Sequence, residues 1–218
     1  MRAAAPPPEL RTQVLDAADR LLARYGYRKM TVDDIASEAG IGKGSVYLAF
    51  ASKEEVALSC IDRMVDELLA ELRAIAAGPR PHLERLRNML ILRVMHRVDY
   101  ARTHAGSMDA MLAAVRPAFL ARRQRHFAAE AEVLSALLET ARQAGAARAV
   151  EARSAAVALV TATNALLPYS LSVAELGRPA EIERRTRALA DLLVQGIAAS
   201  PRSRRTTSSH RTPSRRIP

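Results

Sequence analysis

TVDDIASEAGIGKGSVYLAFASK, residues 31–53, carries the helix-start and turn signals that predict how the first part of this chain folds. Thr31 precedes an apolar-periodic segment and Asp34 follows three residues later, which is the spacing of a capping box, with Asp where Glu is usual. A helix is therefore predicted to begin at about Val32. Gly40 stands where a left-handed residue turns the chain after two helical turns, so a tight turn is predicted there.

A second short helix is predicted over residues 43–50, because Val46 and Phe50 lie four residues apart and share one face. Its other side turns outward. Ser52 and Glu55 form another capping box, so a long third helix is predicted to begin directly after Ser52 and to end near residue 78.

An amphipathic helix is predicted upstream, over residues 10–25, where Gly26 closes it. The three short segments then make a compact helical head of roughly fifty residues. Two short helices joined by a tight turn, with cationic and hydroxyl groups on the second, suit a protein that places a helix in a DNA groove.

The string Val14 to Leu58, VLDAADRLLARYGYRKMTVDDIASEAGIGKGSVYLAFASKEEVAL, resembles the DNA-binding domain of the TetR-like (TetR/AcrR) family of bacterial transcriptional regulators. The shared positions are Ala17, Ala18, Gly26, Tyr27, Thr31, Val32, Asp34, Ile35, Ala36, Ala39, Gly40, Lys43, Gly44, Tyr47, Phe50, Ser52, Lys53 and Glu54. The resemblance covers about a fifth of the chain. It implies an all-α protein with an N-terminal helix-turn-helix DNA-binding domain followed by a helical effector-binding and dimerisation domain.

Four segments are expected on this basis. They are a disordered N-terminus at 1–8, the DNA-binding domain at 9–58 with its helix-turn-helix motif at about 31–50, the ligand-binding and dimerisation domain at 59–198, and a disordered Arg-rich tail at 199–218. The function implied is sequence-specific regulation of transcription, with repression that a small-molecule effector relieves.

In that family the matching positions contact operator DNA, which assigns seven residues to the interface: Thr31, Gly42, Lys43, Gly44, Ser45, Tyr47 and Lys53. Their chemistry fits, since a helix N-terminus, a lysine and a phenol bind phosphate, a serine reaches a base edge and a glycine allows close approach. All of them except Gly42 also have a plainer interpretation. Thr31 caps its helix, the lysines and Ser45 are solvated, and Gly44 and Tyr47 pack within the protein.

Two departures from the family pattern affect DNA reading. Gly42 stands where serine or threonine usually caps the recognition helix, which leaves a phosphate contact without its side-chain oxygen. Leu48 and Ala49 replace larger aromatic or polar residues, so fewer side chains can read bases. The expected determinants are therefore Lys43, Ser45, Tyr47 and the shape of the DNA.

The rest of the chain reads as a series of helices. The predicted ranges are 82–100, a short piece at 108–115, a long helix that Pro117 opens and that ends near 143, then 151–167, a loop at 168–179, and a last helix at 182–197. In the family the last two helices form a homodimer interface, and Ala155, Ala158 and Ala162 allow close packing there. Two-fold symmetry also suits paired heads on paired half-sites.

The family binds a small-molecule effector among the helices of its second domain. The residues expected to line such a pocket are Met89, Met95, His96, Tyr100, Met108, Met111, Phe127, Asn164 and Tyr169. The alternative for each Met or aromatic residue is core packing. His96 stands between Arg93 and Arg97, so its alternative is a position on the surface.

The formal charge of +10 does not by itself carry the DNA prediction. Residues 1–58 hold eight basic and eight acidic residues, whereas the tail holds six arginines and no acid. The tail is either a source of non-specific attraction to phosphate or a solvated extension. The alternative function is therefore a sequence-tolerant architectural DNA-binding protein that relies on this basic tail.

Other classes of protein are disfavoured. The chain lacks a phosphate-binding glycine loop, a serine elbow and paired Cys or His at metal-ligand spacing, so no enzyme, metal or cofactor is expected. Cys60 is the single cysteine, so no intrachain disulfide is possible. Its thiol is expected to be buried or inert, and the alternative is a redox-sensing role. The N-terminus lacks a signal-like apolar stretch, and the uncharged segment 154–174 is too polar for a membrane span, so a cytoplasmic location is expected.

Overall fold

The computed structural model describes residues 7–105, 108–167 and 177–199. Every regular element in these ranges is a helix, apart from one isolated β-bridge between Ala147 and Ala198. The all-α prediction is therefore confirmed. No helix in the described part of the chain has both the length and the apolar character needed to cross a membrane.

The head consists of three helices: α1 (Pro8–Tyr25), α2 (Val32–Ala39) and α3 (Lys43–Ala49). The predicted capping box is complete, because the Thr31 hydroxyl accepts from the Asp34 N–H at 3.1 Å while the Asp34 carboxylate accepts from the Thr31 N–H at 2.9 Å. Gly40 ends α2 at φ 68°, which is the left-handed conformation that its position predicts. Local signals thus place both helices of the motif.

Helix α4 (Lys53–Ala77) runs without interruption from the head into the second part of the chain. Ser52 caps it, accepting from the Glu55 N–H at 3.2 Å. The predicted second half of that capping box is wrong, because the Glu55 carboxylate instead accepts from the Arg122 guanidinium at 2.7 and 2.9 Å. A charged partner 67 residues away competes successfully with the local backbone N–H.

The remaining elements are α5 (His82–Thr103), α6 (Met108–Gln143), α7 (Ala152–Thr163), a short 3-10 helix (Asn164–Leu166) and α9 (Pro179–Ile197). The predicted break before Pro117 is wrong, since α6 continues through it. Proline removes one helical hydrogen bond. That loss is offset because Met111, Val115 and Phe119 form one buried stripe on both sides of the proline.

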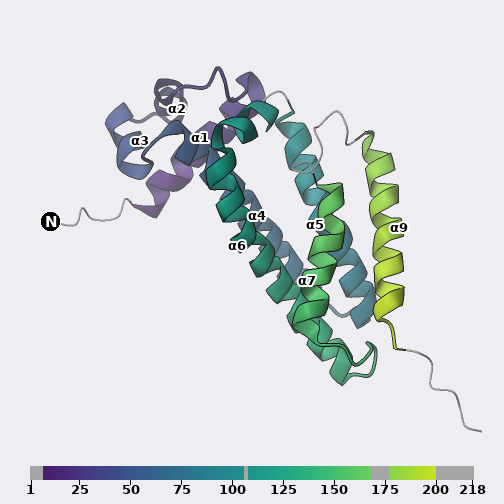
Figure 1. Ribbon diagram of the computed structural model, residues 1–218. Coiled ribbons are helices and arrows are strands. Elements are labelled where there is room, and N and C mark those ends of the chain that lie inside the picture. Colours follow the sequence, from purple (N-terminus) through teal and green to yellow (C-terminus); the bar gives the residue numbers. More distant parts are fainter. Residues whose placement is uncertain (1–6, 106–107, 168–176, 200–218) are drawn as a thin grey trace, which may run out of the picture.

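The head lies at one end of an elongated bundle (Figure 1). In this bundle α6 packs against α4, α5 and α7, whereas α9 packs mainly against α5. One continuous hydrophobic core extends from α1 and α2 of the head, through α4, to α9. The head is therefore held against the bundle by shared apolar packing, and its recognition helix projects from the end.

Candidate nucleic-acid interface

Helix α3 presents one face to the head and the other to solvent. Val46, Ala49 and Phe50 are buried, and they hold the helix against α1 and α2. Tyr47 and Leu48 stand outward, with 50% and 59% of their surfaces exposed. The helix is anchored as the sequence predicts, and its outward face is available to a partner.

Lys43 and Lys53 differ in their surroundings. The exposed Lys43 ammonium donates to the Asp33 carboxylate at 2.9 Å, and this hydrogen bond together with the charge of Asp33 raises the pKa of Lys43. Lys53 is half-buried and donates to the carbonyls of Tyr27 and Met30 at 3.2 and 3.1 Å. Lys53 thus tethers the loop before α2, which leaves one of its three N–H groups for a phosphate.

Gly42 and Gly44, at the start of α3, lie in open space. A Cβ built at Gly42 or Gly44 meets no atom within 4 Å. The packing interpretation of Gly44 therefore has no support among the described residues. Gly42 caps α3 without any side-chain hydrogen bond, as its residue type predicts, and Ser45 is half-buried in the first turn of the helix.

Arg11 supports α3 from beneath, and sequence reasoning missed it. Its guanidinium lies 4.1 Å from the centre of the Phe50 ring and donates to the Ala49 carbonyl at 2.5 Å, which satisfies a free carbonyl at the helix end. These partners are 38 residues apart, so no local pattern could have revealed the contact.

The residues expected to line an effector pocket fall into different environments. Met89, Met108 and Met111 are buried in the core, as the core-packing alternative predicts. Met95 is half-buried beside Val94 and Val98. Tyr169 lies outside the described residues.

His96 and Tyr100 take part in polar contacts instead. The His96 ring lies 3.4 Å from the Glu71 carboxylate, and its side chain is 18% exposed. The Tyr100 hydroxyl donates to Asp19 of α1 at 3.2 Å. Tyr100 therefore links the end of α5 to the head.

Phe127 and Asn164 border a cavity of about 290 Å³ between α6 and α7. Its walls are mainly apolar, with Val157 and Val160 opposite Phe127, and Arg153 supplies a cation. A larger cavity of about 680 Å³ lies among α4, α5 and α6, bordered by Arg73, His82 and Arg85. Sequence reasoning missed the second cavity, because its lining residues come from three separate helices.

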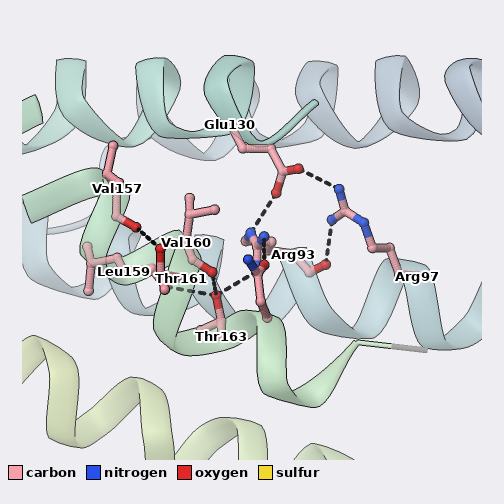
Figure 2. A network of polar contacts seen from close by, with 9 residues as sticks. Arg93, Arg97, Glu130, Val157, Leu159, Val160, Thr161 and Thr163 are labelled. Atoms are coloured by element: carbon pink, nitrogen blue, oxygen red, sulfur yellow. Dashed lines mark hydrogen bonds and ion pairs between the residues drawn. The ribbon is translucent and has the colours of Figure 1, made fainter. Parts of the chain in front are cut away.

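Arg93 and Arg97 are buried, which corrects the expectation of a surface around His96. They are 0% and 2% exposed, and each lies 2.5 Å from one oxygen of the buried Glu130 carboxylate. Figure 2 shows Arg93 also reaching Thr163 of α7, to which its Nη1 donates at 2.6 Å. The negative charge of Glu130 offsets part of the cost of burying two guanidiniums, and the cluster joins α5, α6 and α7.

A second polar cluster, which we call the clasp, joins α6 to the start of α4. It consists of Arg122 and His126 on α6 with Glu55 and Asp62 on α4. Arg122 donates to Asp62 at 2.5 Å, and a ring nitrogen of His126 lies 2.8 Å from the same carboxylate. Burial raises the pKa of Asp62, but the hydrogen bond with His126 and the charge of Arg122 outweigh it and place this pKa below its ordinary value.

No group of three or more His, Cys, Asp or Glu side chains in the described ranges is arranged to hold a metal ion. Cys60 is buried, and burial raises the pKa of its thiol well above the ordinary value. A protonated, buried thiol fits the inert role expected of it.

Comparison with known proteins matches residues 14–60 to the family described as bacterial regulatory proteins, tetR family. The repressor KstR2 of Mycobacterium tuberculosis (strain CDC 1551 / Oshkosh) is 40% identical over 81 residues, which is 37% of this chain and 40% of KstR2. The activator FasR of Mycolicibacterium smegmatis is 35% identical over 82 residues, which is 38% of this chain and 37% of FasR. The match therefore spans less than half the length of these curated relatives.

Solved structures extend the similarity to the helical body. A structure reported as "Molecular basis for control of antibiotic production by a bacterial hormones" aligns with a TM-score of 0.65 at 27% identity, over 88% of this chain and 100% of that one. A TetR/AcrR-family regulator from Thermobifida fusca aligns with a TM-score of 0.61 at 26% identity, over 86% and 98%. KstR2, FasR and the Thermobifida protein are named as regulators of transcription, not as enzymes.

Proposed function

Because this chain belongs to the tetR family of bacterial regulatory proteins, which its residues 14–60 match, we propose that it is a sequence-specific DNA-binding regulator of transcription. Its finer role is that of a repressor which a small-molecule effector releases from its operator, in the cytoplasm. The observation that carries the proposal is the anchored helix α3, whose outward face is exposed at the end of the bundle.

The DNA contacts are proposed at the residues that the motif singles out. Thr31 and the N-terminus of α2 hold a backbone phosphate, Tyr47 and the remaining N–H of Lys53 hold others, and Ser45 reaches a base edge. Lys43 exchanges its exposed Asp33 partner for phosphate or a guanine edge. That exchange costs little, since exposed ion pairs contribute only about 0–1 kcal/mol.

A homodimer through α7 and α9 supplies the second head. Val157 on α7 and Leu192 on α9 are 49% and 67% exposed, and Ala158 and Ala188 are exposed beside them. The two helices touch each other and leave these apolar side chains uncovered within the protomer. A two-fold axis there sets the heads on half-sites about 34–36 Å apart, or a multiple of that distance.

The effector site is proposed at the cavity between α6 and α7, because two of the expected pocket residues, Phe127 and Asn164, border it. Both also touch Arg93: Asn164 accepts from its Nη2 at 2.6 Å, and the Phe127 ring lies 5.3 Å from its guanidinium. His126, adjacent to Phe127, belongs to the clasp. A ligand that displaces α6 therefore acts on the start of α4 and favours a head spacing that binds the operator weakly.

The test is operator binding by the purified full-length protein. Fragments recovered from genomic DNA define the operator, and Lys43→Ala and Tyr47→Ala are each expected to weaken binding to it by about tenfold. A chain truncated after Ser200 retains most of its preference for the operator over random DNA. If truncation abolishes binding and both substitutions are silent, the architectural alternative based on the tail replaces this proposal.

A further inference from the structure

The centre of the outward face of α3 is apolar. Gly44 and Leu48 lie four residues apart, on the side opposite the buried Val46 and Ala49. Lys43 and Tyr47 flank this line on one side, and Ser45 flanks it on the other. A helix that enters a groove with this face brings Gly44 and Leu48 nearest to the base edges.

Gly44 permits a close approach of the helix to the bases. Its Cβ position is empty of protein atoms within 4 Å, and its conformation does not require glycine, so the fold does not account for the missing side chain. A helix without a side chain at this point lies deeper in the groove. Leu48, one turn later and 59% exposed, is then brought against a base edge.

Leucine recognises one kind of base-edge group. The major groove presents hydrogen-bond donors and acceptors on every base pair, and its apolar feature is the C5-methyl group of thymine. A leucine side chain set against a donor or acceptor desolvates it without a partner, which is unfavourable. Set against a methyl group, it buries apolar surface on both sides.

We propose that Leu48 is a specificity-determining residue that contacts a pyrimidine C5-methyl group, that of a thymine, at a fixed position in each operator half-site. This inference rests on the proposed function, and it identifies the base-edge group that the centre of the outward face of α3 recognises. It changes the expectation drawn from the sequence, in which Leu48 marks a loss of base-reading capacity.

The experiment uses the operator recovered with the full-length protein, with uracil replacing one thymine at a time. Uracil differs from thymine only by the methyl group. At one symmetry-related pair of positions, uracil is expected to weaken binding by about fourfold per half-site, as expected for one buried methyl group. An operator with 5-methylcytosine at that position is expected to bind the protein more tightly than one with cytosine there, by a similar factor. This holds whichever pyrimidine the protein prefers overall.

Leu48→Ala tests whether Leu48 is the reader. Its side chain is exposed, so the head is expected to fold normally. For this variant, the affinity for the thymine operator divided by the affinity for the operator with uracil at that position is expected to fall to about one. The reason is that the substitution and the uracil remove the same contact. Two control variants are expected to keep the affinity ratio of the unaltered protein. They are Lys43→Ala and Leu120→Ala, the latter a matched change at an exposed leucine of α6.

The outcomes separate this inference from the proposed function. If no thymine position is sensitive to uracil, or if the sensitivity persists in Leu48→Ala, the inference is wrong while operator binding still stands. If the protein selects no defined operator at all, the proposed function fails first.

Discussion

Some residues of the recognition helix α3 are not needed for its packing, because neighbouring residues already hold the helix in place. Arg11 and Phe50 fasten the end of α3 from within the head, and Val46 anchors its middle. Gly44 therefore has no packing role among the described residues. Its distinguishing property is that it lacks a side chain.

Gly44→Ala separates folding from DNA binding. Because the added methyl group meets open space and alanine favours helix, the free energy of unfolding is expected to rise by up to about 1 kcal/mol. Operator affinity is expected to fall by about tenfold, since the methyl group keeps the helix from the bases. Denaturant unfolding and gel-shift titration measure the two effects. Unchanged affinity with raised stability contradicts a close approach at this position.

At the scale of elements, two polar clusters connect helices that lie far apart in the sequence. The clasp joins α6 to the first turns of α4, directly after the head. The buried cluster of Arg93, Arg97 and Glu130 joins α5, α6 and α7. Hydrogen bonds with fixed geometry set the register of one helix on another more narrowly than apolar contacts do.

The clasp makes stability depend on pH through Asp62. The pKa of Asp62 is lowered in the folded protein, so the ionised form contributes stability above the unfolded pKa of about 3.9. That contribution is lost as the pH falls through the folded pKa. Urea unfolding between about pH 5 and pH 2 is therefore expected to show a shallower pH dependence for Asp62→Asn than for the unaltered protein. Identical slopes exclude a role for Asp62.

Glu130 is expected to be the most sensitive position of the buried cluster. Glu130→Gln removes the carboxylate that contacts both guanidiniums, which is expected to lower the free energy of unfolding by about 3–5 kcal/mol. Glu139→Gln on the surface of the same helix, where the partner is Arg142, is the control and is expected to unfold almost as the unaltered protein does. Equal effects at the two glutamates contradict the burial argument.

The described part of the chain forms an elongated bundle with a head at one end (Figure 1). Apolar side chains on α7 and α9 are exposed in the protomer. One protomer presents a single recognition helix. In the homodimer that we propose, pairing through α7 and α9 covers these side chains and produces two heads related by symmetry.

Leu192→Asp tests this pairing. Leu192 is 67% exposed, so the substitution leaves the fold of the protomer intact while placing a charge in the proposed interface. Sedimentation at micromolar concentration is expected to show a monomer, and operator affinity is expected to drop. Leu120→Asp, at an exposed leucine of α6, is expected to remain dimeric. A Leu192→Asp variant that sediments as a dimer locates the interface elsewhere.

Features that depend on neighbours a few residues away follow from the amino-acid sequence alone. The capping box of Thr31 and Asp34, the left-handed turn at Gly40 and the common face of Val46 and Phe50 on α3 were all predictable, because each depends on residues at most four positions apart. The outward position of Tyr47 follows from the same helical period.

The partners of the charged residues, by contrast, depend on how distant helices pack together. Arg93 and Arg97 are buried because Glu130 and Thr163 come from helices 33 and 70 residues away, and Glu55 leaves its capping role for Arg122. Likewise α6 continues through Pro117, because the buried stripe of Met111, Val115 and Phe119 extends on both sides of the proline. The role of a charged residue depends on which charged or polar groups lie next to it in the folded protein. A local sequence pattern does not specify these groups when they belong to other helices.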